Sequence, residues 1–243
     1  MSLRNGVVII AGATKGLGRE IAVQAYNLNC PLALIARNME DLERLRLEVE
    51  RPDGPLISVH AVDLTDATRT SNVFKEIAKK HKKVFALVNC AATWTGGRKV
   101  KELSANDMLN SLQLNFFSAF NPIQSMLSLP VDILQKPASI INVGATASLR
   151  GSKSCSAFAV AKGALRQLSQ SLARELGSED VHVAHLIIDG LIDNPRTRKL
   201  NLNVENDKFI NPTSIANSIL HVIFQEKSCW TFEWDIRPFN ESW

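Results

Sequence analysis

Lys162 stands inside an otherwise apolar helical pattern between residues 155 and 176. The apolar residues of this stretch recur at three- and four-residue steps, which predicts that they share one face of a helix. They are Phe158, Ala161, Leu165, Leu168 and Leu172. Lys162 follows Phe158 by four positions, so the two side chains are expected to lie one above the other. A lysine beside an aromatic ring in an apolar stretch is a candidate for chemistry, and its role depends on what surrounds it.

A glycine-rich turn follows the first apolar run of the chain. The run GVVIIAG (6–12) leads into ATKGLGREIA, so that Gly12, Gly16 and Gly18 follow an expected strand and open an expected helix. Glycines let backbone N–H groups approach a pyrophosphate, and the helix N-terminus adds a partial positive charge. The spacing of the glycines, together with the strand before and the helix after them, predicts a dinucleotide-binding turn.

The end of the second apolar run favours NADP(H) as the nucleotide. A site for NAD usually has Asp or Glu there to bind the ribose 2′-hydroxyl, whereas this chain has Ala36 followed by Arg37. Lys15 lies in the glycine turn itself. Two cations near the expected place of an adenosine 2′-phosphate favour NADP(H), because charge-assisted contacts to phosphate are strong. The alternative is that Lys15 and Arg37 are only exposed surface charges.

Short apolar runs alternate with amphipathic segments along the whole chain. The runs lie at 6–12, 31–37, 56–64, 84–92, 138–145, 181–190 and 230–238, and the helical patterns at 17–28, 39–50, 67–81, 104–129, 153–177 and 212–226. Strands that are apolar almost throughout are buried on both faces, which implies a parallel sheet with helices on each side. We therefore predict one α/β domain over residues 1–243, a doubly wound Rossmann sheet of seven parallel strands. The polar stretch 191–211 is the expected substrate lid.

Composition narrows the possible partners. The chain has 243 residues, 45% hydrophobic and 21% charged, with a net charge of +4. The basic residues are scattered apart from the cluster at 79–83, which is typical of a solvated helix end, so no nucleic-acid partner is predicted. The four cysteines form neither a CxxC nor a metal-ligand spacing, which predicts free thiols in a reducing compartment and no metal site. No signal peptide and no membrane span are expected, so we predict a cytoplasmic protein without a membrane partner.

Over nearly its whole length the chain resembles the short-chain dehydrogenase/reductase family. The resemblance is carried by the cofactor turn Gly12-Ala13-Thr14-Lys15-Gly16-Leu17-Gly18, Asp63-Leu64, Asn89-Cys90-Ala91-Ala92, Asn115, Lys162, and Gly190 with Ile192. It implies cofactor contacts from these segments and from Arg37. It also implies that Lys162 binds the nicotinamide-ribose hydroxyls and that Asn115 supports a proton-relay water. Asp189 and Asn194 stand where the family's segment after the sixth strand has Pro and Thr.

The chain departs from the family at the position of the proton donor. In the family, the lysine lowers the pKa of a tyrosine four residues earlier, and a serine further upstream also polarises the substrate oxygen. Here the tyrosine position holds Phe158, and the serine position aligns with Ala145. The single tyrosine of the chain is Tyr26, on the first expected helix. Both oxygen-polarising hydroxyls are therefore missing.

Three other side chains are candidates to replace these hydroxyls. Thr146 could turn inward by a shift of one residue, and Ser148 is the next hydroxyl along the same loop. Asp189 ends the sixth apolar run, where such sheets bind ligands, and could donate a proton if burial raises its pKa. The alternatives are a plain loop role for Thr146 and a turn role for Asp189. His185 lies within an apolar run and is interpreted as a core histidine.

Three functions follow from this pattern. The first is an NADP(H)-dependent oxidoreductase of a small-molecule substrate, in which Thr146, Asp189 or a water held by Asn115 supplies the proton. The second is a catalytically silent nucleotide-binding scaffold, and the third is a non-redox enzyme on the same fold. The resemblance also implies a homodimer or homotetramer. Alternating residues of the last run, Trp230, Phe232, Trp234 and Ile236, form either a face for self-association or a cover for the chain's own core.

Overall fold

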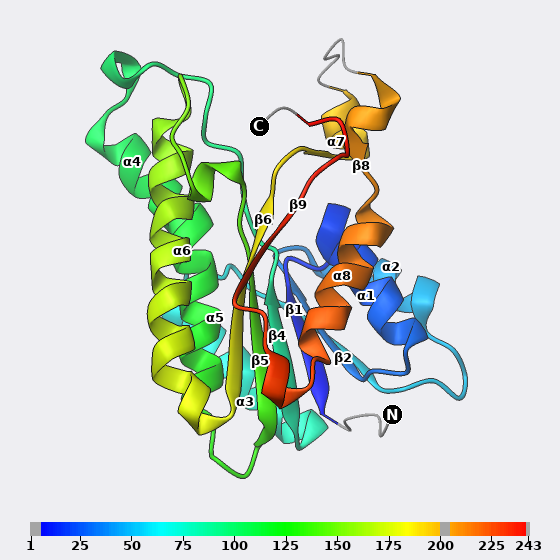
Figure 1. Cartoon of the computed structure of the whole chain (residues 1–243). Coiled ribbons are helices and arrows are strands. Elements are labelled where there is room, and N and C mark those ends of the chain that lie inside the picture. The colour runs from blue at the N-terminus through cyan, green and yellow to red at the C-terminus, as the bar shows by residue number, and fades with distance from the viewer. Residues whose placement is uncertain (1–5, 200–204, 242–243) are drawn as a thin grey trace.

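Seven parallel strands form the central sheet of the computed structural model, which describes residues 6–199 and 205–241 (Figure 1). The strand order is β3-β2-β1-β4-β5-β6-β9. The strands are β1 (Val7–Ala11), β2 (Leu32–Ala36), β3 (Ile57–Ala61), β4 (Val84–Asn89), β5 (Leu134–Val143), β6 (Val181–Ile188) and β9 (Glu233–Ile236). Every neighbouring pair is parallel. The predicted doubly wound sheet is confirmed, and its order reverses between β1 and β4, where such sheets bind ligands.

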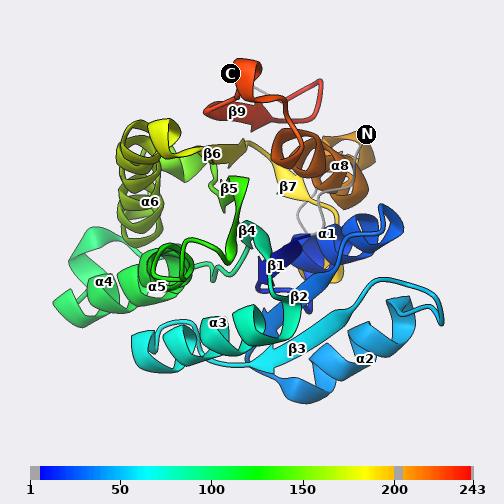
Figure 2. The same ribbon diagram turned by 90° about the horizontal axis from the view of Figure 1, so that it is seen from below.

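Helices cover both faces of this sheet (Figure 2). The helices are α1 (Gly16–Asn27), α2 (Met39–Val49), α3 (Ala67–His81), α4 (Ala105–Leu112), α5 (Ser118–Leu127), α6 (Ser156–Leu176), α7 (Pro195–Arg198) and α8 (Pro212–Ile223). Short 3₁₀ turns lie at Val100–Glu102, Thr146–Ser148, Gly177–Glu179, Asn206–Lys208 and Lys227–Cys229. One apolar cluster lies beneath α1, α2 and α8, and a second beneath α3, α5 and α6. The central strands alternate between the two clusters because successive side chains point to opposite faces.

The single helix predicted over 104–129 is interrupted. A π-helical turn, Gln113–Phe117, separates α4 from α5. Asn115 lies in this turn, where its Nδ2 donates to the carbonyl oxygen of Ser111 four residues earlier (3.2 Å). The side-chain amide thus satisfies a carbonyl next to the widened turn. Hydrophobic periodicity could not reveal this break, because the apolar pattern continues through it.

The last strand packs against the chain's own core. Trp234 and Ile236 on β9 contact the cluster beneath α8, and the Trp234 indole donates to Ser218 Oγ (3.0 Å). Trp230 stacks on His182, with ring centroids 4.8 Å apart. Arg166 on α6 makes a two-armed ion pair with Glu233 on β9, at 2.6 and 2.9 Å. These contacts favour the second interpretation of the aromatic face, and self-association stays a prediction.

The segment after β6 carries short regular elements. β7 (Leu191–Ile192) pairs with β8 (Phe209–Ile210), and α7 lies between them. Arg198 pairs with Asp193 and lies over the ring of Phe209, 3.9 Å from its centroid. Residues 200–204 of the predicted lid lie outside the described residues, and its role as a lid stays a prediction. In the described part of the chain, no helix is long and apolar enough to span a bilayer.

His185 belongs to a buried network of hydrogen-bonded polar side chains on β5, α6 and β6. Ser169 Oγ donates to the Leu165 carbonyl (2.8 Å) and accepts from Asn142 Nδ2 (2.9 Å). It can therefore accept a hydrogen bond from His185 Nδ1, 3.2 Å away, which assigns a proton to Nδ1. Burial lowers the pKa of His185 to about 4. His185 is a core histidine, as predicted.

We predict that this histidine makes the fold acid-sensitive. Above pH 6.5 the ring is neutral in both the folded and the unfolded chain. As the pH falls from 6.5 towards 4, only the unfolded chain takes up this proton, so stability is lost. The loss should reach about 2–3 kcal/mol. Thermal unfolding followed by circular dichroism between pH 7.5 and 4.5 measures it. His185→Gln should remove that part of the pH dependence, and an unchanged pH profile in this variant would contradict the prediction.

Candidate active site

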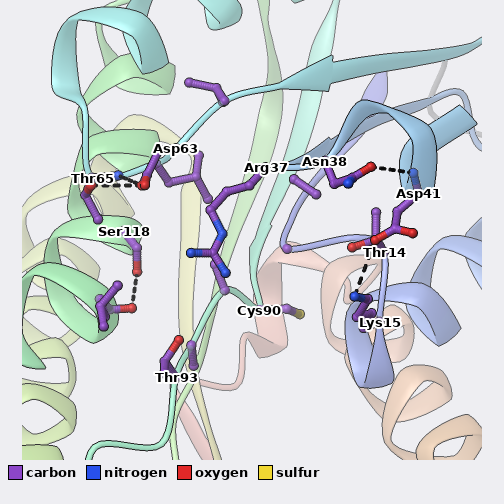
Figure 3. Close-up of a pocket in the computed structure, with 17 residues that line it drawn as sticks. Thr14, Lys15, Arg37, Asn38, Asp41, Asp63, Thr65, Cys90, Thr93 and Ser118 are labelled. Atoms are coloured by element: carbon purple, nitrogen blue, oxygen red, sulfur yellow. Dashed lines mark hydrogen bonds and ion pairs between the residues drawn. The ribbon is translucent and has the colours of Figure 1, made fainter.

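A pocket opens at the carboxyl ends of β1, β2, β3 and β4 (Figure 3). Its lining residues come from the turns that follow these strands. They are Gly12, Thr14 and Lys15, Ala36, Arg37 and Asn38, Val62, Asp63, Leu64 and Thr65, and Cys90, Ala91, Ala92 and Thr93, with Asp41, Leu114 and Ser118 at the margin. Parallel strands bring these four turns to one edge. The pocket therefore brings together seven predicted cofactor residues, whereas four others of the first half, Gly16, Leu17, Gly18 and Asn89, do not line it. The seven are Gly12, Thr14, Lys15, Arg37, Asp63, Leu64 and Ala91.

Two glycines allow the backbone to approach closely beside this pocket. Gly12 has φ +89°, and a Cβ there would lie 2.7 Å from the Ala91 nitrogen. A Cβ on Gly18 would lie 2.1 Å from the carbonyl oxygen of Gly12. Both contacts are closer than any side chain allows, so these positions require glycine. Gly16 begins α1, and a Cβ there would meet nothing within 4 Å.

The two predicted cations of the pocket differ in their surroundings. The Lys15 side chain is 82% exposed, and its Nζ pairs with Asp41 Oδ2 at 3.3 Å. Arg37 forms no ion pair within 4 Å among the described residues, and Figure 3 shows its guanidinium extending across the middle of the pocket. A backbone hydrogen bond from Thr65, together with the charge of Arg37, lowers the pKa of Asp63. Arg37 is thus the cation available to an anionic ligand here.

Sequence reasoning missed Asp41. Asn38 caps α2 by accepting the backbone N–H of Asp41 (2.9 Å), which brings the Asp41 carboxylate back to the glycine turn. The sequence signal is a helix start at Asn38 with an acid three residues later. This carboxylate pairs with Lys15, which is largely exposed, and both interpretations of Lys15 stay predictions.

A second pocket continues from the first towards β5 and β6. The two share Lys15, Cys90 and Ala92, and the second adds Leu17, Gly18, Val143, Gly144, Ala145, Phe158, Lys162, Ile188, Gly190 and Ile192. Together they form an elongated groove across the point where the strand order reverses. A dinucleotide fits such a groove, because close backbone approach at Gly12 and Gly18, an open cation at Arg37 and buried donors at Lys162 lie along it.

Lys162 lies buried at the floor of this second pocket. Its side chain reaches the end of β5, where Nζ donates to the Val143 carbonyl oxygen at 2.8 Å. The residue is 3% exposed, and burial lowers the pKa of the ammonium group to about 8. Nζ lies 5.9 Å from the centroid of the Phe158 ring, as the four-residue spacing predicts. The same ring contacts Trp94, with centroids 5.0 Å apart.

The residues at the two expected hydroxyl positions lie at the same pocket. Ala145 and Phe158 both line it, so the structure brings together the positions that sequence reasoning paired. Thr146 and Asp189 contact each other instead. Thr146 Oγ1 donates to Asp189 Oδ1 (2.5 Å), and Asp189 Oδ2 pairs with Arg237 (3.2 Å). Neither side chain is among the described residues that line the pocket.

Ser148, Asn115 and Asn89 make hydrogen bonds that hold the loops and strand ends around the groove. Ser148 Oγ accepts the backbone N–H of Ala145 at 3.1 Å. Asn115 Oδ1 accepts the backbone N–H of Thr93 at 2.8 Å, which holds the loop after β4. Asn89 Nδ2 donates to Asn142 Oδ1 at 2.8 Å and joins the ends of β4 and β5. These contacts position the walls of the groove.

Cys90 is a further residue that sequence reasoning did not single out. It lines both pockets, and burial raises the pKa of its thiol to about 12. The thiol is therefore neutral near pH 7. Among the described residues, no group of three or more His, Cys, Asp or Glu side chains could hold a metal ion.

Comparison with known proteins assigns the family. The short chain dehydrogenase family matches residues 6–205. A 3-oxoacyl-[acyl-carrier-protein] reductase of Bos taurus is 29% identical over 195 residues, 80% of this chain and 79% of that protein. A short-chain dehydrogenase structure from Rhodopseudomonas palustris has a TM-score of 0.79 at 27% identity, covering 97% of this chain and 100% of that one. An alcohol dehydrogenase from the archaeon Thermococcus sibiricus, complexed with 5-hydroxy-NADP, has a TM-score of 0.85 at 19% identity and covers 98% of both chains. With the matched region spanning the glycine turn, Lys162 and the strand-order reversal, this chain belongs to the short-chain dehydrogenase family.

Proposed function

We propose that this protein is an NADP(H)-dependent oxidoreductase that interconverts a carbonyl compound and its alcohol with a non-standard proton donor. The observation that carries the proposal is the groove itself, with Arg37 open at one end and Lys162 buried at the other. The family supports oxidoreductase chemistry, and the bovine relative is named as a reductase.

The preference for NADP(H) rests on charge at the end of β2. Ala36 stands where a carboxylate would bind a ribose 2′-hydroxyl, and Arg37 follows it with no ion pair within 4 Å in the described residues. A guanidinium binds phosphate oxygens strongly and in a fixed geometry. The related Thermococcus enzyme was solved with an NADP derivative, which is compatible with this preference.

Different residues along the groove have different roles in the proposed reaction. The glycine turn holds the pyrophosphate by its backbone N–H groups, and Arg37 holds the 2′-phosphate. Lys162 donates hydrogen bonds at the nicotinamide end of the groove. The nicotinamide, when bound, supplies or accepts the hydride. Phe158, whose ring contacts Trp94, gives the groove an apolar side there.

The same apolar side indicates the kind of substrate. Ala145, Phe158, Ile188 and Ile192 make the surface beside Lys162 largely apolar. A ketone with an apolar chain on at least one side fits such a wall. The bovine relative's name points to a 3-oxoacyl group, so we propose a 3-oxoacyl compound as the first substrate to test.

Two alternative functions stand beside the proposed oxidoreductase activity. If no hydride transfer is found, the absence of hydroxyls at Ala145 and Phe158 favours a silent nucleotide-binding scaffold or a non-redox enzyme over the proposed activity.

We also propose a homodimer or homotetramer, because β9 ends the described sheet and leaves its outer edge open. Four free cysteines support a reducing, cytoplasmic location.

We predict that Arg37→Asp weakens NADPH binding about 10- to 100-fold, because a charge-assisted phosphate contact is lost. NADH binding should change less than threefold, since NADH has no 2′-phosphate. Fluorescence titration of both nucleotides measures the dissociation constants. Arg174→Asp makes the same charge change at the far end of α6 and should alter neither constant. Equal affinity of the wild-type protein for NADPH and NADH would refute the assignment.

We predict that Phe158→Tyr combined with Ala145→Ser raises the rate of reduction of simple ketones at least about 100-fold. Both positions line the pocket, and Lys162 already lies one helical turn from the new phenol. Steady-state rates with NADPH measure the gain, and each single substitution should give less than the pair. A double variant that binds NADPH normally without a faster rate would show that the pocket is closed to ketones.

A further inference from the structure

We propose that the ammonium group of Lys162 is itself the proton donor to the substrate oxygen, in place of the hydroxyls that Phe158 and Ala145 lack. This inference rests on the proposed function and names the catalytic acid of that reaction. It gives Lys162 a direct role in proton transfer in addition to cofactor binding.

Few side chains with a titratable proton line the second pocket, where Lys162 lies. Among the described residues that line it, the side chains with a titratable proton are Lys15, Cys90 and Lys162. Lys15 is largely exposed and pairs with Asp41. The thiol of Cys90, with a pKa near 12, is a weaker acid than an ordinary thiol. Lys162 is the remaining donor at the wall formed by Phe158.

The hydroxyls and the carboxylate that were candidates for this role are engaged elsewhere. Thr146 donates a hydrogen bond to one carboxylate oxygen of Asp189, and the other oxygen of Asp189 forms an ion pair with Arg237. Both oxygens of this carboxylate are thus engaged, and neither Thr146 nor Asp189 is among the described residues that line the pocket. Ser148 lies behind Ala145 and accepts that residue's N–H. The tie between Thr146 and Asp189 also holds the β5–α6 loop against the end of β6.

Nζ of Lys162 has hydrogen-bonding capacity left for ligands. An ammonium group has three N–H donors, and one is directed to Val143. No carboxylate lies within ion-pair distance of Nζ in the described part of the chain. The remaining N–H groups are therefore available to the groove, where a ribose hydroxyl and a substrate oxygen can both accept.

Burial without a counter-charge makes this lysine a stronger acid than an exposed one. Its pKa of about 8 is close to physiological pH, where proton transfer by a general acid is most effective. The titratable groups around it are Cys90 at the end of β4 and His185 on β6. Both are neutral at pH 7, so neither offsets the cost of burying the ammonium charge.

The proposed step balances as follows. A ketone gains a hydride, delivered by a reduced nicotinamide, and a proton. The N–H bond of Lys162 breaks and leaves its electron pair on Nζ as a neutral amine. The substrate oxygen receives the C=O π pair and forms the new O–H bond. A proton from the solvent then restores the ammonium group, so that reduction consumes one solvent proton, and oxidation of the alcohol reverses each of these changes.

Lys162→Arg tests the proton transfer apart from binding. A guanidinium keeps the positive charge and the hydrogen bonds but does not release a proton near neutral pH. We expect the dissociation constant of NADPH to stay within about fivefold and the rate of reduction of a 3-oxoacyl thioester to fall about 10²- to 10⁴-fold. Lys153→Arg makes the same change on the exposed loop before α6 and should alter neither value.

A second readout needs no turnover. The ¹⁵Nζ signal of Lys162 in the ligand-free protein, assigned by its loss in Lys162→Arg, should titrate near pH 8, well below the value of about 10.4 for an unperturbed lysine in a model peptide. If the arginine variant does not fold, Lys162→Ala replaces it. Added methylammonium or ethylammonium should then restore part of the lost rate, with a pH dependence that follows the pKa of the added amine.

The outcomes separate the two proposals. Failure of the wild-type protein to bind NADPH would refute the proposed function, and the titration of Nζ would still report the acidity of Lys162. Three results would each overturn the lysine as donor: a titration above pH 10, an unimpaired rate in Lys162→Arg, or NADPH binding without reduction of any 3-oxoacyl thioester or 3-oxo ester. The last of these would favour a silent binding protein.

Discussion

The hydrogen bond from Lys162 Nζ to the Val143 carbonyl joins α6 to the carboxyl end of β5 at the centre of the groove. An ammonium group with no counter-ion is costly to bury, so it must keep hydrogen bonds that favour its charge. Val143 provides one, and ligands in the groove can provide the others. Phe158, which contacts Trp94, and Val143 both line the second pocket beside this hydrogen bond.

A second set of contacts fixes the walls around that lysine. Asn115 holds the loop after β4 through Thr93, and the pair of Thr146 and Asp189 holds the loop after β5 against the end of β6. In both cases a polar side chain supports the backbone of the groove. The polar side chains of these loops therefore hold the shape of the groove, whereas Arg37 and Lys162 line it without a carboxylate partner among the described residues.

The fold could be predicted from the sequence because its strands are buried on both faces and appear as continuous apolar runs. The positions of the expected cofactor residues could be predicted as well, since Gly12 and Gly18 follow a strand at a fixed spacing and Lys162 follows Phe158 by one helical turn. Their contacts with a cofactor stay predictions. The pair of Asp41 with Lys15 and that of Thr146 with Asp189 could not. They depend on how separate loops meet at the sheet edge, and no periodicity records that. The π-helical turn at Asn115 was hidden because it leaves the hydrophobic pattern unbroken.

The substitution at Phe158 changes the chemistry of the groove without changing its architecture. A phenol at this position would have a hydroxyl whose proton affinity the nearby ammonium lowers. A phenyl ring has no hydroxyl, and it packs on Trp94 with its centroid 5.9 Å from Nζ. Burial lowers the pKa of the lysine to about 8. The replacement therefore removes one proton donor and leaves the buried ammonium group in place, because a phenyl ring and a phenol ring cover the lysine alike.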